Sequence, residues 1–276
     1  MAMVVQHNLR AMNSNRMLNV NTQSQVKSAE KLSSGYKINR AADDAAGLAI
    51  SEKMRRQMRG LTQASANAQD GISMVQTAEG ALNEVHDMLQ RMNELAVKAE
   101  NGTLTTTDRS YINSEVQQLM SEIDRVASTT TFNEKNLLNG TFSATADACK
   151  LQVGAESGQH ISLNIKKMTC SGLSLTGATA TSTANAASLN DKVKKAITTL
   201  STQRSNLGAV QNRLEHTINN LDNVVENTTA AESRIRDTDM ATEMVKYSNN
   251  NILAQAGQAM LAQSNQANQG VLSLLQ

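Results

Sequence analysis

The feature that most constrains this chain is a row of small and apolar residues whose spacing alternates between three and four over residues 61–96. That spacing places every member on one side of an α-helix, and a row this long is typical of a helix packed in a coiled coil or bundle. Asn101-Gly102-Thr103 follows the row and predicts the end of the helix. The row consists of Leu61, Ala64, Ala68, Gly71, Val75, Ala78, Leu82, Val85, Leu89, Met92 and Ala96.

Two further segments carry the same spacing. One is short, over residues 112–126, and the other runs over residues 189–235 with polar interruptions at Gln203, Thr217 and Thr228. The short link between the first two segments predicts an antiparallel pair of helices. Three amphipathic helices that cover one another's apolar sides make a long helical bundle.

Residues 129–187 lack the helical spacing. Asn139-Gly140 predicts a hairpin turn, and alternating apolar residues over 151–165, around Ser157-Gly158, predict a second hairpin with one apolar face. The small, hydroxyl-rich residues 174–188 predict a surface loop. The predicted fold is therefore mainly α, a long antiparallel helical bundle or coiled coil with a small β-hairpin region.

Residues 251–276 contain no charged side chain. Apolar residues recur there at every seventh position, with one more alongside; they are Leu253, Met260, Ala267 and Leu274, with Val271. A lone helix of this kind is marginal in water, and a solvated helix surface normally carries charges. We therefore expect residues 1–32 or other copies of the chain to enclose this segment. We interpret these residues as a polymerisation interface.

A joint separates residues 1–32 from the long helix. Ser33-Ser34-Gly35 interrupts helix, and Asp43 and Asp44 precede Ala45 as helix-capping residues do. Adjacent side chains at a helix start do not face one another, so the two carboxylates are not expected to form a catalytic acid–base pair. Gly35, Asp43 and Asp44 are therefore predicted to form a structural joint.

The composition disfavours an enzyme. The 276-residue chain has no proline or tryptophan, three tyrosines and two phenylalanines, so it lacks the aromatic residues that commonly line a pocket. Its net charge of +1 gives no general attraction for nucleic acid or an anionic membrane. No segment is apolar enough for a membrane span, and residues 1–30 lack an apolar signal sequence.

Metal and redox chemistry also find no support in the sequence. Cys149, Cys170 and the scattered histidines match no zinc spacing. The spacing of the two cysteines leaves both a disulfide and two free thiols open. We expect no catalytic residue, no metal and no cofactor.

At this point the chain is seen to resemble bacterial flagellin along nearly its whole length. Agreement at both ends at once is far more specific than any single short motif. The matching stretches are "NLRAMNSNRMLN", "EKLSSGYKINRAADDAAGLAISEKMR", "ANAQDGISMVQTAEGALNEVHDMLQRMNELAVKAENGT", "EIDRVASTTTFNEKNLLNG", "LQVGAESGQHISLNI" and "AAESRIRDTDMATEMVKYSNNNILAQAGQAMLAQSNQANQGVLSLLQ".

The resemblance implies a short flagellin without the outer domains that longer members insert. Residues 1–32 and 237–276 would pair as terminal helices in an inner assembly domain of the filament, and residues 33–46 would form the connecting spoke. Residues 47–187 would form the helical bundle domain with its hairpins, and residues 188–236 would be the C-terminal helix of that domain.

The resemblance also implies a structural subunit of the extracellular flagellar filament, used for swimming motility. The chain would be exported unfolded and would assemble with copies of itself. Further implied partners are the export apparatus, a chaperone for the C-terminal segment, and the filament cap and hook-associated proteins. A flagellin-like hook–filament junction protein is the alternative. A coiled-coil signalling or secretion-needle protein would explain the heptads but not the hairpins.

The terminal segments have too little apolar surface to fold alone, because fixing each residue costs roughly 1–2 kcal/mol. Our hypothesis is that residues 1–32 and about 240–276 are disordered in the free subunit and fold on assembly.

Flagellins are also ligands of the vertebrate Toll-like receptor for flagellin. Arg91, Leu95 and Glu115 match the contact motif of the family. Arg91 and Leu95 are four residues apart and share one helix face, off the apolar row. The resemblance therefore implies a receptor site with an exposed leucine and a charged rim. Packing between subunits is the alternative use of this surface.

Overall fold

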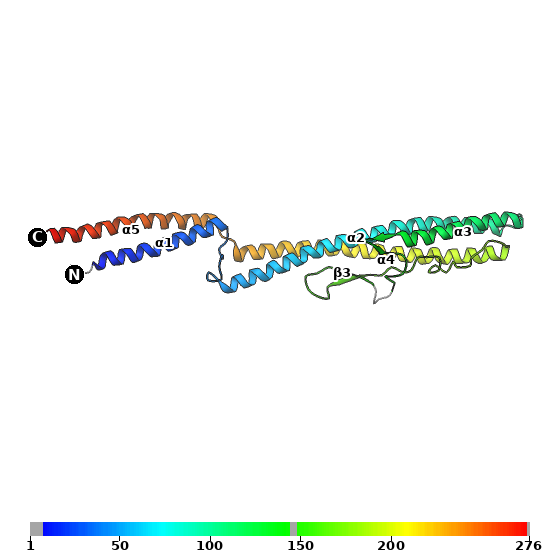
Figure 1. Ribbon diagram of the computed structural model, residues 1–276, viewed down its shortest axis with the longest axis horizontal. Helices are drawn as coiled ribbons and strands as arrows, with labels where there is room; N and C mark the ends of the chain where they lie inside the picture. Colours follow the sequence, from blue (N-terminus) through cyan, green and yellow to red (C-terminus); the bar gives the residue numbers. More distant parts are fainter. Residues whose placement is uncertain (1–7, 144–147, 275–276) are drawn as a thin grey trace. The chain divides into compact units, whose positions relative to one another are not determined.

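The computed structural model describes residues 8–143 and 148–274, and it describes side chains as far as Ala267. Long helices account for most of the described chain (Figure 1). In chain order the elements are α1 (Leu9–Ser34), α2 (Ala45–Glu100), α3 (Thr106–Thr129), β1 (Thr131–Phe132), β2 (Lys135–Asn136), β3 (Cys149–Gln152), β4 (His160–Leu163), α4 (Thr183–Arg236) and α5 (Met240–Leu274).

The chain divides into two compact units. The terminal unit contains residues 1–56 and 227–276, and the bundle unit contains residues 57–226. The limits of these units fall inside α2 and α4, whereas the sequence placed its boundaries at residues 46 and 236, close to helix ends. The domain ranges drawn from the resemblance stay predictions.

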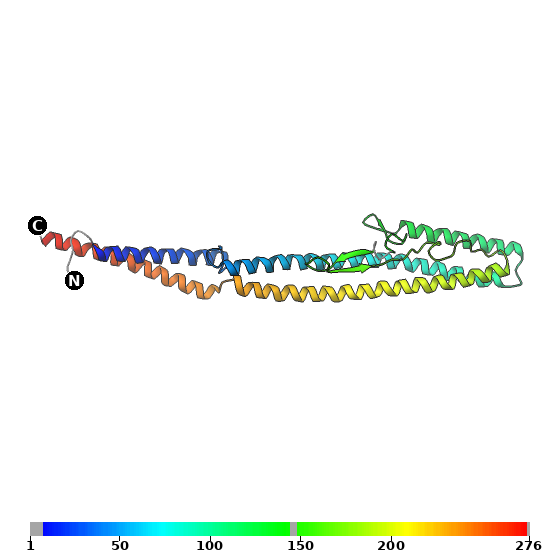
Figure 2. The same ribbon diagram turned by 90° about the horizontal axis from the view of Figure 1, so that it is seen from below.

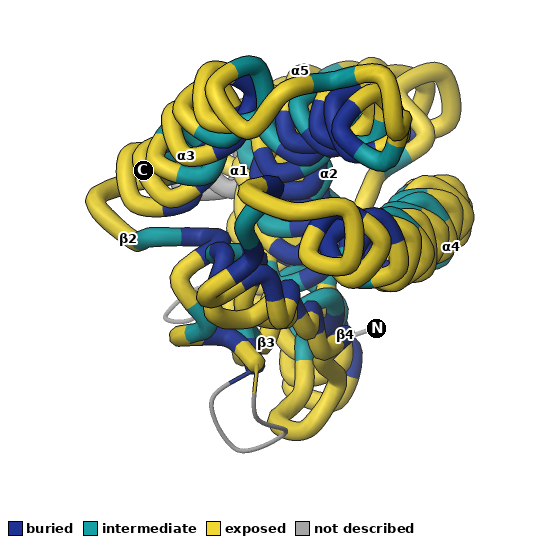
Figure 3. Tube along the Cα trace, turned by 90° about the vertical axis from the view of Figure 1, so that its right-hand side faces the viewer, coloured by how far each residue is buried: buried dark blue, intermediate teal, exposed yellow. Residues whose placement is uncertain are grey.

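The bundle unit is built on the apolar row of α2. Every member of the row from Leu61 to Ala96 is buried. α3 and α4 run alongside α2 within this unit, and α3 runs back along it (Figures 1 and 2). In Figure 3, which colours the Cα trace by burial, buried residues recur along one side of each helix and exposed residues along the other. The three predicted apolar rows therefore pack on one another.

Local signals fix where these helices begin and end. α2 ends at Glu100, directly before the predicted stop at Asn101. α3 begins with a reciprocal pair of hydrogen bonds, because the Asp108 amide donates to the Thr105 hydroxyl over 3.3 Å. The Thr105 amide in turn donates to the Asp108 carboxylate over 2.9 Å. This capping box satisfies two amides that a helix start leaves unpaired.

The first predicted hairpin turn is wrong. β1 and β2 pair antiparallel around Asn133 and Glu134, which have φ of 47° and 64°, whereas Asn139-Gly140 lies after β2. Leu137 and Leu138 are fully buried. The chain therefore leaves the short ladder at Asn136 to insert these two leucines into the core, and burial overrides the Asn-Gly preference.

The second predicted hairpin is confirmed. β3 and β4 pair antiparallel, with Leu151 opposite Ile161 and Cys149 opposite Leu163. The hairpin lies close against α2, since a Cβ on Gly71 would come 2.5 Å from Cδ1 of Leu151. Glycine at this point of the row lets the hairpin approach the helix.

The predicted surface loop at residues 174–188 is confirmed only in part: residues 174–182 form neither helix nor strand and most of the segment is exposed, but some of it is buried and some is helical. Leu175, Ala178 and Ala180 are buried, and α4 already begins at Thr183. Side-chain amides of α3 hold this segment: Gln117 donates to the Ala178 carbonyl over 3.0 Å, and Asn113 accepts from the Ala180 amide over 3.0 Å. Small side chains here allow close packing on the bundle.

Both cysteines are free thiols, which settles the alternative that their spacing left open. Cys149 is half-buried and Cys170 is buried. Burial raises the pKa of the Cys170 thiol to about 12, so this thiol is essentially unreactive near neutral pH.

Candidate functional site

The terminal unit pairs the two ends of the described chain. Asn8 of α1 donates to the carbonyl of Ser264 over 3.3 Å, and Ser28 donates to the carboxylate of Glu243 over 2.7 Å. Partner numbers on α5 fall as those on α1 rise, so the two helices are antiparallel. Figure 1 shows them side by side.

The seam between α1 and α5 has heptad spacing, but most of its residues are small or polar. Its positions alternate by three and four and are buried or half-buried. On α1 they are Ala11, Ser14, Leu18, Asn21, Gln25 and Ser28; on α5 they are Tyr247, Asn250, Ala254, Gly257, Leu261 and Ser264. The interior of this pair therefore buries few apolar side chains.

Large apolar side chains of the pair instead face outward. Each is about half exposed or more, from 47% for Met240 to 68% for Leu9. On α1 they are Leu9, Met12, Met17, Val20 and Val26; on α5 they are Met240, Met244, Val245, Ile252, Leu253 and Met260. We call these residues the outward apolar set. Exposed apolar groups in such number are typical of a surface that binds another protein.

Three predicted interface residues can be located. Leu253 is 50% exposed, Met260 is 62% exposed and Ala267 is exposed. The side chains of Val271 and Leu274 lie outside the described residues. The sequence had no means of identifying the members on α1 or Ile252, because these positions follow no single repeat. The neighbouring stripe of α5 through Ala254 and Leu261 contacts α1.

A buried carboxylate fixes one point of the seam. Glu243 is 5% exposed, and one of its carboxylate oxygens accepts a hydrogen bond from the Ser28 hydroxyl. Lys246 pairs with the other carboxylate oxygen over 3.4 Å. The hydrogen bond from Ser28, supported by Lys246, holds the pKa of Glu243 below its usual value, although burial opposes this. A buried polar contact of this kind favours one register of two helices.

The predicted joint has three different local roles. Gly35 ends α1 with a left-handed φ of 75°, which glycine adopts without strain. Asp44 caps α2 by accepting from the Gly47 amide over 2.9 Å. Asp43 does not cap the helix; it accepts from the amides of Asn39 and Arg40, which lowers the pKa of its carboxyl.

A cluster of charged groups around Tyr36 ties the two ends of the joint together. The guanidinium of Arg236 lies 4.9 Å from the centre of the Tyr36 ring and that of Arg55 lies 5.7 Å from it. Arg236 also pairs with Glu52 over 2.8 Å, and Arg55 with Glu232 over 3.2 Å. We call these five residues the joint cluster.

Two backbone hydrogen bonds reinforce the joint cluster. The Lys37 amide donates to the Arg236 carbonyl over 2.6 Å, and the Thr238 amide donates to the Gly35 carbonyl over 3.0 Å. These bonds cross-link the segment after α1 to the segment after α4. The sequence predicted the joint but gave no signal for its partner segment.

The predicted receptor site is corrected at one residue. Arg91 is exposed and pairs with Glu115 over 2.9 Å and with Glu94 over 3.0 Å, so it links α2 to α3. Leu95, in contrast, is only 3% exposed and belongs to the bundle core. The expectation of an exposed leucine is wrong, because α3 covers a wider part of α2 than the apolar row alone indicates.

Two searches of the described part of the chain gave negative findings. None of its helices has the length and apolar character that crossing a bilayer requires. Its histidine, cysteine and acidic side chains nowhere gather in threes as a metal ion would need.

The chain is similar to known proteins along nearly its whole length. The family described as bacterial flagellin N-terminal helical region matches residues 5–143, and bacterial flagellin C-terminal helical region matches residues 190–275. Flagellin of Halalkalibacterium halodurans is 55% identical over 275 residues, covering 99% of this chain and all of that protein. Flagellin of Bacillus subtilis is 50% identical over 303 residues, with the same coverage.

A solved structure agrees with these matches. The crystal structure of Bacillus cereus flagellin is 32% identical and superposes with a TM-score of 0.50, covering 56% of this chain and 88% of that chain. Both family regions and full-length relatives thus account for the paired ends and for the helical bundle. The chain belongs to the bacterial flagellin family.

Proposed function

We propose that this structural subunit of the extracellular flagellar filament polymerises through the outward apolar set of α1 and α5. Fully burying one large aliphatic side chain contributes roughly 1.5–3 kcal/mol. The set supplies several such side chains on each helix, all about half exposed or more in the single subunit. Copies of the chain are the partners that supply the missing cover.

Charge supports the same assignment. Residues 251–276 have no charged side chain, so burying this part of α5 between copies leaves no unpaired ion in the interface. The side of α5 that contacts α1 is a different stripe of the helix, made mostly of small and polar residues. Leu253, Met260 and Ala267 therefore remain available for other subunits.

Folding of the ends is proposed to accompany assembly. The seam of the terminal pair buries little apolar surface, while ordering each residue costs roughly 1–2 kcal/mol. Contacts between subunits would offset this cost. Coupling the two events would keep free subunits from polymerising before they reach the growing filament.

The test is a double substitution on the outward side of α5. Leu253→Ser/Met260→Ser removes apolar surface without touching the seam, and we expect filament growth from seeds to cease, as measured by light scattering and electron microscopy. The matched control is Gln258→Ser/Gln263→Ser, which alters two exposed polar residues of the same helix. Normal filaments from the first variant would overturn the proposal.

Receptor binding is a second candidate function, and the exposed pair of Arg91 and Glu115 favours it. The pair projects from two helices held on a rigid core, which gives a partner a fixed charged surface. Leu95 would act beneath this surface, by positioning α2. Arg91→Ala should lower signalling through the Toll-like receptor for flagellin, whereas Arg125→Ala, at another exposed ion pair of the bundle, should not. Unchanged signalling by Arg91→Ala would exclude the assignment.

The remaining partners follow from the family. We propose that the chain is exported unfolded, with a chaperone on its C-terminal segment, and that the cap and hook-associated proteins bind the ends of the filament. The absence of charge over residues 251–276 supports the chaperone proposal, because an uncharged helix with outward apolar side chains needs cover before assembly.

A further inference from the structure

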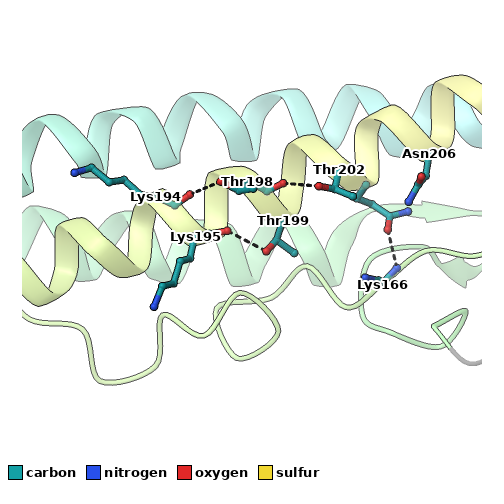
Figure 4. A pocket seen from close by; sticks show the side chains of 8 residues that line it. Lys166, Lys194, Lys195, Thr198, Thr199, Thr202 and Asn206 are labelled. Carbon is teal, nitrogen blue, oxygen red and sulfur yellow. Dashed lines mark hydrogen bonds between the residues drawn. The ribbon is translucent and has the colours of Figure 1, made fainter.

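A cavity of about 420 Å³ lies on the bundle unit, between α4 and the segment after β4 (Figure 4). Three lysines line it: Lys194 and Lys195 from α4, and Lys166 from the segment after β4. Threonines of α4 lie between Lys166 and the pair Lys194 and Lys195, as Figure 4 shows. Neither the proposed polymerisation surface nor the Arg91 surface includes any of these residues.

The positive charge of this cavity is not paired with any acidic residue that the structure describes. Within the described part of the chain, Lys166, Lys194 and Lys195 form no ion pair with an acidic residue. Asp191 lies one helical turn before Lys194 and Lys195 in the sequence, and it forms no ion pair with either of them. The lysines therefore remain free to bind an anion.

The threonines present acceptors rather than donors. Thr198 donates its hydroxyl proton to the Lys194 carbonyl over 3.0 Å, and Thr199 donates to the Lys195 carbonyl over 2.9 Å. Thr202 likewise donates to the Thr198 carbonyl over 2.9 Å. Their oxygen lone pairs are left to accept hydrogen bonds from a ligand.

A buried glutamine of α4 fixes the backbone of the opposite wall of the cavity. Gln203 is only 2% exposed; its side-chain nitrogen donates to the Asn164 carbonyl over 3.0 Å, and its oxygen accepts from the Lys166 amide over 3.5 Å. This buried side chain ties the segment that carries Lys166 to α4. The backbone that carries Lys166 is thereby fixed relative to α4, and the three lysine side chains extend from it into solvent.

We propose that this cavity binds an acidic polysaccharide, a chain of sugars that carry carboxylate or sulfate groups. The lysines would bind the anionic groups, and the threonine oxygens would accept hydrogen bonds from sugar hydroxyls. The lining residues on α4 run from Lys194 to Asn206, twelve residues or ~18 Å along the helix axis. A single small anion cannot bridge that distance, whereas a short run of charged sugars can.

The lining also argues against a neutral sugar. The described residues around the cavity include no aromatic side chain on which an uncharged sugar ring could stack. Recognition would therefore depend on charge and hydroxyl groups. Affinity should accordingly fall steeply as salt is raised.

The test uses the full-length chain and three probes of similar length: a dextran sulfate oligomer, a polygalacturonate oligomer and neutral dextran. Calorimetry should detect binding of at least one acidic probe and none of neutral dextran, and the preferred probe distinguishes sulfated from carboxylated sources. Lys194→Gln/Lys195→Gln should weaken binding by about tenfold or more, as expected for losing charge-assisted contacts.

Two further variants make the test specific. Lys98→Gln/Lys135→Gln removes the same charge from exposed lysines elsewhere in the bundle unit and should leave the affinity within about twofold. Thr198→Val/Thr202→Val keeps the side-chain shape and removes the acceptors, and it should weaken the acidic sugars but not free sulfate. Equal losses in the two lysine pairs, or no binding of either acidic probe, would overturn the proposal.

Discussion

The bundle unit and the terminal unit use the same heptad spacing with opposite chemistry. In the bundle, the row from Leu61 to Ala96 turns apolar side chains inward and buries all of them. In the terminal pair, most seam residues are small or polar, and most of the large apolar side chains face outward. Spacing therefore determines which sides of two helices meet, whereas residue type determines whether the pair is stable without further partners.

The two units also differ in which large side chains they bury. The largest fully buried side chains, among them Leu82, Leu89 and Met92, all lie in the bundle unit. In the described part of the terminal unit the buried apolar side chain is Ile38, at the joint. This difference agrees with our proposal that the bundle folds by itself and that other subunits complete the terminal pair.

The largest expected effect is on amide hydrogen exchange in the free subunit. Amides of residues 75–96 should exchange roughly a thousandfold more slowly than those of residues 250–264, because only the first group lies in a self-sufficient core. Mass spectrometry at low protein concentration measures this difference. Assembled filaments are the control, in which residues 250–264 should become slow. Equal protection of both segments in the free subunit would remove the distinction between the two units.

A pair of leucine truncations sharpens the same contrast. Leu89→Ala should lower the free energy of unfolding of the free subunit by about 2–5 kcal/mol, because Leu89 is fully buried. Leu253→Ala, at a half-exposed position, should change it by less than about 0.5 kcal/mol. Urea unfolding followed by circular dichroism measures both. Similar losses would mean that the terminal pair is already packed in the free subunit.

The joint cluster should mark the boundary between the two behaviours. Arg236→Ala removes the ion pair with Glu52 and the contact with the Tyr36 ring, and the amides of Lys37 and Thr238 should then exchange roughly tenfold faster. Arg236→Lys keeps the charge and should show a smaller increase. Unchanged exchange at both amides in Arg236→Ala would show that the backbone bonds alone hold the joint.

The smallest expected effect is a pH dependence of the terminal pair. The folded pKa of Glu243 is below its ordinary value of 4.5, so its stabilising contribution is complete above that pH and is lost as pH falls through the lower, folded pKa. In Glu243→Gln, the extent of filament dissociation should depend less steeply on pH below 4.5, as followed by sedimentation. Glu84→Gln, at an exposed carboxylate of the bundle, should not. A similar change from both variants would contradict a specific role of Glu243.

Sequence reasoning was most successful where local pattern and burial agree. The row on α2, the stop at Asn101 and the hairpin of β3 and β4 were all predicted, because periodicity and turn residues are local signals. It failed at Asn139-Gly140, in the buried part of residues 174–188 and at Leu95. At Leu95 and at residues 175–180, segments distant in sequence cover side chains that spacing or local polarity marks as exposed; at Asn139-Gly140, the hairpin turn instead forms earlier, at Asn133 and Glu134.

The candidate site likewise has residues that the sequence predicted and residues that it could not indicate. Leu253, Met260 and Ala267 follow a repeat of seven and were predicted as an interface, and their exposure in the single subunit is compatible with that prediction. The outward residues of α1 follow no single repeat, so only the pairing with α5 shows which side of α1 is free. The joint cluster unites residues almost 200 positions apart, and no local pattern could have indicated it.

The sequence by itself determined that the chain is helical and where the long helices stop, and it led to the hypothesis that the ends are too poor in apolar surface to be stable alone. Those properties depend on residue spacing, capping and composition, which act over a few turns of helix. Only the tertiary structure decided which stripe of α5 meets α1, which side chains remain outward, and how the two linkers are tied at Tyr36. Such choices depend on the close packing of distant segments, where geometry and burial outweigh local preference.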